Sequence, residues 1–105
     1  MTTTATKISK AAITRKLNAK GFEQARWISN GVRTTEGFMT SELRTGAIAI
    51  DYYNNGGVRD IDDEFIARHV RKIANIATYL QGEGIATRMI SDNTTGLITL
   101  IIDNY

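Results

Sequence analysis

Cysteine and proline are absent from this 105-residue chain, and histidine and tryptophan each occur only once. Without cysteine the chain has no disulfide, no thiol nucleophile and no thiolate ligand for a metal. Without proline its turns must rely on glycine, asparagine and aspartate. A chain of this length builds one domain with a modest core. The absences therefore exclude the function classes that depend on thiol chemistry.

Long hydrophobic runs are also missing. No stretch of 18 apolar residues occurs in the sequence, so nothing in it is expected to span a membrane. The first ten residues, MTTTATKISK, lack the apolar centre of a signal peptide, which predicts a cytoplasmic protein. Residues 1–6 are polar and are expected to form a disordered tail, with residues 7–105 forming a single domain.

Charges of both signs are present but unevenly distributed. Residues 1–50 contain eight basic and three acidic side chains, whereas residues 51–105 contain five basic and eight acidic ones. The net charge is +2. This asymmetry indicates either a basic face that meets an acidic partner or two solvated surfaces that happen to differ.

Two segments have the composition or the spacing of helices. Residues 7–20 are rich in good helix formers, and Ile13 and Leu17 are four apart and share one face. Residues 62–81 carry the clearest signal, because their apolar side chains recur at helical spacing. These side chains are Phe65, Ile66, His69, Val70, Ile73, Ile76, Ala77 and Leu80.

Five further segments have the alternation or the apolar content of β-strands. They are residues 22–29, 37–44, 47–53, 85–91 and 96–105. Asn30-Gly31 suits a tight hairpin turn, and residues 32–37 show no period and are expected to be an exposed loop. The order α-β-β-β-α-β-β predicts an α+β domain with a mainly antiparallel sheet and both helices packed on one face.

The last predicted strand is nearly continuous in apolar residues from Leu97 to Ile102. Such a strand is covered on both faces or lies in the centre of a sheet. At a sheet edge it would favour pairing with a second copy, so a homodimer stays open.

Few residues are suited to catalysis or to metal binding. His69, the only histidine, lies at the apolar edge of the second predicted helix, which indicates a residue bordering the core and not a ligand. Four acids within residues 60–64 gather where a helix dipole favours negative charge, which explains them without acid–base catalysis. Residues 51–62 have the spacing of a calcium loop, but Tyr53 stands where a carboxylate ligand is needed. We therefore predict a protein that is not an enzyme and has neither a metal nor a cofactor.

The stretch RWISNGVRTTEG, residues 26–37, favours binding. Its Trp27 has an arginine on each side, and tryptophan, tyrosine and arginine dominate protein interfaces. Basic residues beside an aromatic ring also suit nucleic acid, by contacting phosphates and stacking a base. The first predicted helix adds Lys7, Lys10, Arg15, Lys16 and Lys20. The candidate binding residues for either partner are Arg26, Trp27, Arg33, Lys16, Lys20 and Tyr53. The alternative for Trp27 is that it fills the core.

A short pattern extends over residues 13–60. It consists of Ile13, Leu17, Gly21-Phe22, Arg33, Gly37-Phe38 and Asp51-Tyr52. The pattern resembles that of small uncharacterised accessory proteins encoded by bacteriophages, chiefly phages of actinobacteria. The resemblance implies no catalytic residues, and it implies a protein that binds a host factor, as inhibitors of host defence such as anti-CRISPR proteins do.

The expected function is therefore non-enzymatic binding, and inhibition, of a host macromolecule, foremost a protein such as a host-defence component. The alternative is nucleic-acid binding through the basic first helix and residues 26–33.

Overall fold

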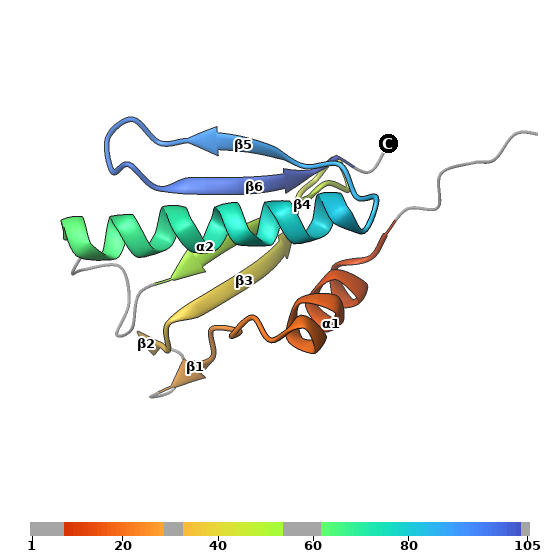
Figure 1. The fold of residues 1–105 in the computed structure, drawn as a ribbon. Coiled ribbons are helices and arrows are strands. Elements are labelled where there is room, and N and C mark those ends of the chain that lie inside the picture. Colours follow the sequence, from red (N-terminus) through yellow and green to blue (C-terminus); the bar gives the residue numbers. More distant parts are fainter. Residues whose placement is uncertain (1–7, 29–32, 54–61, 104–105) are drawn as a thin grey trace, which may run out of the picture.

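A four-stranded antiparallel sheet carries two helices, and a two-stranded ribbon lies beside it (Figure 1). The computed structural model describes residues 8–28, 33–53 and 62–103. The elements in chain order are α1 (Lys10–Lys20), β1 (Trp27–Ile28), β2 (Arg33–Thr34), β3 (Gly37–Glu42), β4 (Ile48–Tyr53), α2 (Asp63–Gly82), β5 (Arg88–Ser91) and β6 (Ile98–Ile102). The α+β class predicted from the sequence is confirmed.

The main sheet has the strand order β3-β4-β6-β5. The hairpin β3–β4 is followed by α2, which crosses over to β5, and β6 then returns between β4 and β5. The apolar last strand is thus an interior strand, as its composition predicted. The strand at that edge of the sheet is β5.

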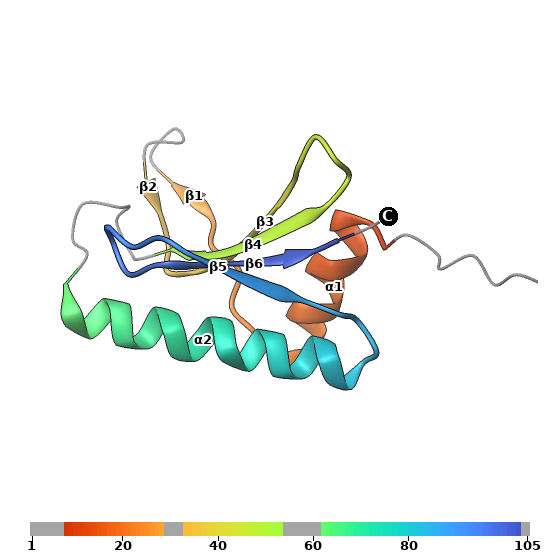
Figure 2. The same ribbon diagram turned by 90° about the horizontal axis from the view of Figure 1, so that it is seen from above.

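α2 lies along one face of the sheet and supplies most of the helical side of the core (Figure 2). The Asp62 carboxylate caps its first turn by accepting a hydrogen bond from the Phe65 N–H at 2.8 Å. Its buried residues follow the predicted helical spacing: Phe65, His69, Ile73, Ile76, Ala77 and Leu80. Val70, predicted on the same stripe, is instead 38% exposed because it lies at the margin of the contact with the sheet.

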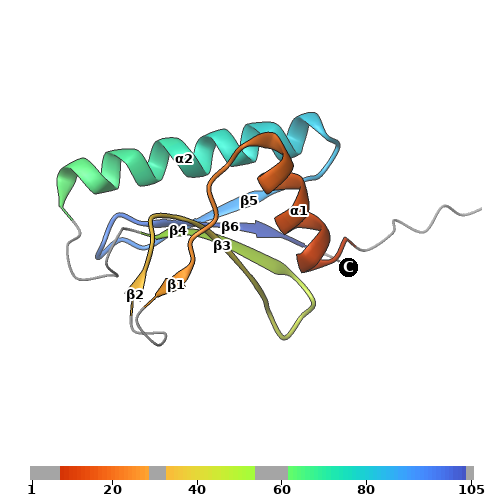
Figure 3. The same cartoon turned by 90° about the horizontal axis from the view of Figure 1, so that it is seen from below.

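α1 begins at Lys10, three residues later than predicted, because Ser9 caps its first turn through a hydrogen bond from the Ala12 N–H. Gly21 ends the helix with φ +107°, a left-handed conformation that favours glycine. Ile13 and Leu17 join the same core cluster as α2 and one face of the sheet. Both helices therefore pack on one face, as expected, and Figure 3 shows α1 beside the β3 side of that sheet.

The predicted strand over residues 22–29 is wrong in its extent and in its place. Of the described residues 22–28, only Trp27–Ile28 forms a strand, and it pairs with Arg33–Thr34 in a separate antiparallel ribbon. Residues 23–25 instead run beside β3, joined to it by one parallel bridge between Gln24 and Phe38. The segment expected to be an exposed loop, residues 32–37, therefore contributes β2, because backbone pairing with β1 satisfies its polar groups.

Several sequence predictions lie outside the described residues: the tail at 1–6, the turn at Asn30-Gly31 and the acid Asp60. Among the described helices, none combines the length and the apolar content that crossing a membrane requires.

Candidate functional site

The position of α1 on the sheet decides which of its basic side chains point toward the 26–37 stretch. Ile13 and Leu17 are fully buried against the core. The Thr14 hydroxyl is hydrogen-bonded to the Thr40 hydroxyl of β3 at 2.8 Å. One flank of α1 is thereby fixed against β3, next to the segment that leads into β1.

That segment lies directly on the edge of β3. The Ala25 N–H donates to the Phe38 carbonyl at 2.8 Å, and the Phe38 N–H donates to the Glu23 carbonyl at 2.9 Å. A Cβ added to Gly37 would lie 2.5 Å from the Ala25 nitrogen and 2.6 Å from the Glu23 oxygen, closer than real Cβ atoms come. Glycine at position 37 is therefore what allows this close backbone approach.

The ribbon continues from this anchored segment and presents Trp27. The Arg26 N–H donates to the Thr35 hydroxyl at 2.9 Å. The Thr35 N–H donates to the Arg26 carbonyl at 2.9 Å. The Trp27 side chain is 59% exposed and belongs to neither core cluster. The alternative that Trp27 fills the core is thus excluded.

A surface hollow of about 580 Å³ lies between α1, the anchored segment and β3. Its lining residues are Lys10, Ala11, Thr14, Arg15, Gln24, Ala25, Arg26, Trp27, Met39 and Thr40. Among the described residues, no acid lines it, and none of its three cations, Lys10, Arg15 and Arg26, takes part in an ion pair. We call this feature the cationic hollow. Its charge is therefore available to an anionic partner.

The sequence did not indicate that Met39 belongs to this surface. Alternation along β3 indicates only that Met39 points away from the face that buries Phe38. That α1 and residues 24–27 border it depends on the tertiary fold. Met39 thereby adds apolar surface beside Trp27 in the cationic hollow.

Two of the predicted binding residues on α1 lie outside the cationic hollow. The Lys16 ammonium is 2.8 Å from a Glu83 carboxylate oxygen at the end of α2, and this hydrogen bond raises the pKa of Lys16. The Lys20 ammonium lies over the ring of Tyr79, 5.7 Å from its centroid. Both follow a buried residue by three positions, which turns them toward α2 and away from Trp27.

The remaining two predicted residues are placed differently again. Tyr53 pairs with Gly37 in the β3–β4 register and is half-buried, and burial followed by the charge of Asp51 raises the pKa of its hydroxyl. Arg33 pairs with Ile28 in the ribbon, and its side chain lies outside the described part of the structure. Among the five predicted residues whose side chains the structure describes, Arg26 and Trp27 alone are brought together in the cationic hollow.

A second hollow of about 570 Å³ lies near the first and shares Arg26 and Gln24 with it. Its lining also includes Asn18, Phe22, Glu23, Thr35 and Glu36. Two carboxylates there offset the single arginine, so this hollow offers no net positive charge to a ligand.

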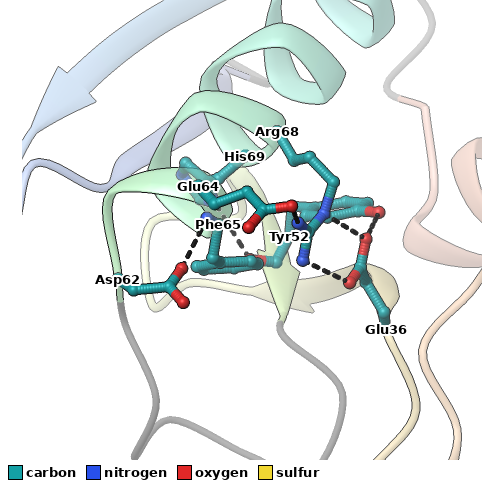
Figure 4. A network of polar contacts seen from close by, with 7 residues as sticks. All are labelled: Glu36, Tyr52, Asp62, Glu64, Phe65, Arg68 and His69. Carbon is teal, nitrogen blue, oxygen red and sulfur yellow. Dashed lines mark hydrogen bonds and ion pairs between the residues drawn. The ribbon is translucent and has the colours of Figure 1, made fainter.

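A polar network joins the start of β3 to β4 and α2 (Figure 4). The Tyr52 hydroxyl donates to Glu36 Oε2 at 2.6 Å, and Arg68 donates to both oxygens of the same carboxylate at 3.2 and 3.0 Å. Burial alone would raise the pKa of Glu36, but the hydrogen bonds from Arg68 and Tyr52 outweigh it and hold the pKa below its ordinary value. Burial and then the hydrogen bond to Glu36 raise the pKa of Tyr52. The network therefore fixes a charged carboxylate and a neutral phenol at pH 7.

His69 bridges β4 and β6 inside the core and is only 2% exposed. Its Nδ1 is 2.9 Å from the Tyr52 carbonyl oxygen, and its Nε2 accepts the Ile98 N–H at 2.8 Å and lies 3.0 Å from the Ile98 carbonyl oxygen. The Tyr52 carbonyl can only accept, so Nδ1 is the donor in that hydrogen bond. Backbone pairing between β4 and β6 ends at Ile50 and Leu100, and the ring takes the place of the next hydrogen bond of that ladder. His69 is thus a structural residue within the core.

Several of the described carboxylates have partners within the fold. No group of three or more histidines and acids among them is arranged to hold a metal ion. Asp62 caps α2, and Glu64 forms an ion pair with Arg68 at 3.8 Å. The Asp51 carboxylate accepts a hydrogen bond from the Thr99 hydroxyl at 2.6 Å. These carboxylates have structural partners that account for their positions.

Comparison of the chain with protein-family models, with curated proteins and with solved structures finds no match.

Proposed function

We propose that this chain is a non-enzymatic binding protein of the phage-accessory type, which acts in the cytoplasm of a bacterial host by binding and inhibiting a host protein. The cationic hollow is the proposed binding site, and an acidic surface that carries an apolar contact is the proposed target. The observation that carries the proposal is the set of three cations without an acidic partner in the described structure, gathered beside an exposed tryptophan.

The residue types of the cationic hollow suit a protein partner. Tryptophan, methionine and arginine are enriched where protein interfaces are fully buried, and lysine and arginine at the rim steer an acidic partner into place. Trp27 is 59% exposed, so a partner would cover on the order of 100–150 Å² of its surface. At ~25 cal/mol per Å² this burial contributes about 3 kcal/mol, which is about a hundredfold in Kd.

The rigid attachment of the site supports the same proposal. Arg26 is held by two hydrogen bonds to Thr35, and the segment before it by two to β3. A binding surface whose backbone is already ordered loses less conformational entropy when its partner arrives.

Nucleic acid is the second candidate, favoured by the sequence pI of about 9.1 and by an exposed aromatic ring beside cations. Three phosphate contacts would give a salt dependence of about −2.7 in log K against log salt for a duplex. The cationic hollow contains only three cations among the described residues, and Asp63 and Glu64 place negative charge at the start of α2. This limited cationic surface favours a protein partner over a nucleic acid.

The proposal is tested by affinity capture from an actinobacterial host lysate, followed by titration of the purified partner. We expect Trp27→Ala to weaken binding by about a hundredfold and Arg26→Glu to weaken it strongly. Arg71→Glu reverses an exposed charge on α2, outside the hollow, and serves as the matched control that binds like the wild type. A partner that binds all three variants equally well would remove the cationic hollow from the interface.

The nucleic-acid candidate is tested separately by a mobility-shift assay at low salt with duplex DNA, single-stranded DNA and RNA. If a probe binds the wild type and Arg71→Glu but not Arg26→Glu, the partner of the cationic hollow is a nucleic acid and not a protein. If none of the three probes binds, the second candidate is excluded.

A further inference from the structure

β5 forms the outer edge of the sheet at the end opposite to β3, and Figure 1 shows no described element beyond it. All four of its residues are exposed, and Met89 and Ile90 are 47% and 48% exposed. β5 is short and carries one charge, Arg88, but neither a proline nor a bulge interrupts its pairing with β6, and both features commonly protect a sheet edge.

The register with β6 determines which backbone groups of β5 point outward. The Asp92 N–H donates to the carbonyl of Leu97, the residue just before β6, at 2.9 Å. Because hydrogen-bonding direction alternates along an antiparallel strand, Ile90 also directs its backbone groups toward β6. Met89 and Ser91 therefore direct their N–H and C=O groups away from the sheet.

We propose that this edge binds the β5 edge of a second copy of the chain, in an antiparallel pair with Ile90 opposite Ile90 of the other copy. In this register Met89 lies opposite Ser91 of the other copy, so both outward-facing residues of each strand exchange backbone hydrogen bonds. The resulting dimer joins two four-stranded sheets into one continuous sheet about a two-fold axis.

Charge complementarity selects this register over its neighbours. Arg88 is paired with Asp103 of its own chain through two hydrogen bonds. With Ile90 at the two-fold axis, this arginine also lies opposite Asp92 of the other copy, on the same sheet face as the two isoleucines, and adds a second carboxylate to its existing pair. Shifting the pairs so that Met89 faces Met89 would place Arg88 opposite Ile90 instead. Shifting them so that Ser91 faces Ser91 would place Asp92 opposite Ile90. The first arrangement pairs opposite charges twice and apolar side chains once, whereas both alternatives lose these pairs.

Such a dimer leaves the cationic hollow of each copy accessible, because the hollow lies at the β3 side of the sheet. The inference does not depend on the proposed function. The paired strands are short, so the interface is smaller than that of a stable dimer, and we expect self-association at roughly 0.1–1 mM.

Sedimentation equilibrium from about 0.01 to 1 mM tests the dimer. We expect the wild type to dimerise and Ile90→Lys to remain a monomer, because two like charges would meet at the two-fold axis. Leu43→Lys changes a comparably exposed apolar residue, 41% exposed, on the β3–β4 turn and should dimerise like the wild type. A wild-type chain that stays monomeric over the whole range, or a dimer that Ile90→Lys leaves intact, would overturn the proposal.

A crosslinking experiment tests the register. The chain contains no cysteine, so Ile90→Cys introduces a single thiol at the two-fold axis. A non-hydrogen-bonded pair places its Cα atoms about 4.5 Å apart, within the range that a disulfide bridges. Ser91→Cys is the matched control, because its two copies would lie roughly 9 Å apart and beyond that range. Mild oxidation should therefore link Ile90→Cys and not Ser91→Cys, and the reverse result would overturn the register.

Discussion

Replacing Gly37 by alanine should detach residues 23–25, the anchored segment before β1, from the edge of β3. The added Cβ would lie 2.5 Å from the Ala25 nitrogen and 2.6 Å from the Glu23 oxygen, and both are backbone atoms that cannot rotate aside. Relief requires the segment to move off β3, which breaks two backbone hydrogen bonds to Phe38. At about 1 kcal/mol for each bond, with about 1 kcal/mol of residual overpacking, the free energy of unfolding should fall by about 3 kcal/mol.

Urea denaturation of Gly37→Ala measures this loss, and the fluorescence of Trp27, the only tryptophan, reports on the site in the folded protein. The matched control is Gly82→Ala, because a Cβ on Gly82 meets nothing within 4 Å and alanine is the better helix former. We expect the control to be neutral or slightly stabilising. A Gly37→Ala variant within about 0.5 kcal/mol of the wild type, with an unchanged Trp27 spectrum, would refute the packing of residues 23–25 against β3.

Three further changes test the polar contacts of the fold. His69→Ala leaves the Tyr52 carbonyl and the Ile98 N–H without their partner in the core, so urea denaturation should show a loss of about 4 kcal/mol; a loss below about 1 kcal/mol would contradict the bridge. Tyr52→Phe removes only the hydroxyl that binds Glu36 and should cost about 1.5 kcal/mol in the same assay, whereas an unchanged stability would show that this bond contributes nothing. Folding lowers the pKa of Glu36 below 4.5, so its stabilisation is present above that pH and is lost as the pH falls through the lower, folded value. Lowering the pH from about 5 to about 3 should therefore lower the melting temperature of the wild type more than that of Glu36→Gln. Equal decreases in the two melting temperatures would contradict the lowered pKa.

The elements that follow a strict local period could be predicted from the sequence. The apolar spacing of α2 and the alternation of Ile48, Ile50 and Tyr52 in β4 place their side chains in the core as expected. The interior position of β6 followed from its continuous apolar run. In these segments each residue's burial depends on the helical or strand period, which a single sequence displays.

The path of residues 23–28 could not be predicted in the same way, because a contact between distant parts of the chain determines it. Gly37 permits residues 23–25 to approach β3, and nothing near Gly37 in the sequence signals that neighbour. The apolar and polar residues of 22–29 were therefore interpreted as one strand of the sheet. Within the described part, residues 22–28, the strand is limited to Trp27–Ile28, and its partner is β2.

The sequence indicated the candidate binding residues by their residue type, but not the surface toward which each side chain points. Lys16 and Lys20 turn toward Glu83 and Tyr79 of α2, although their spacing of three from Ile13 and Leu17 carried that information. The basic residues of α1 thus lie on two different surfaces, one at the cationic hollow and one facing α2.

The central claim is that a host protein covers the cationic hollow, and a single fluorine resonance tests it most directly. Because Trp27 is the only tryptophan, growth with 5-fluorotryptophan places one ¹⁹F label in the hollow. On titration with the captured partner, we expect that resonance to shift and its exposure to solvent to fall, with Arg26→Glu suppressing both changes. A resonance that stays unchanged at saturating partner would contradict the account.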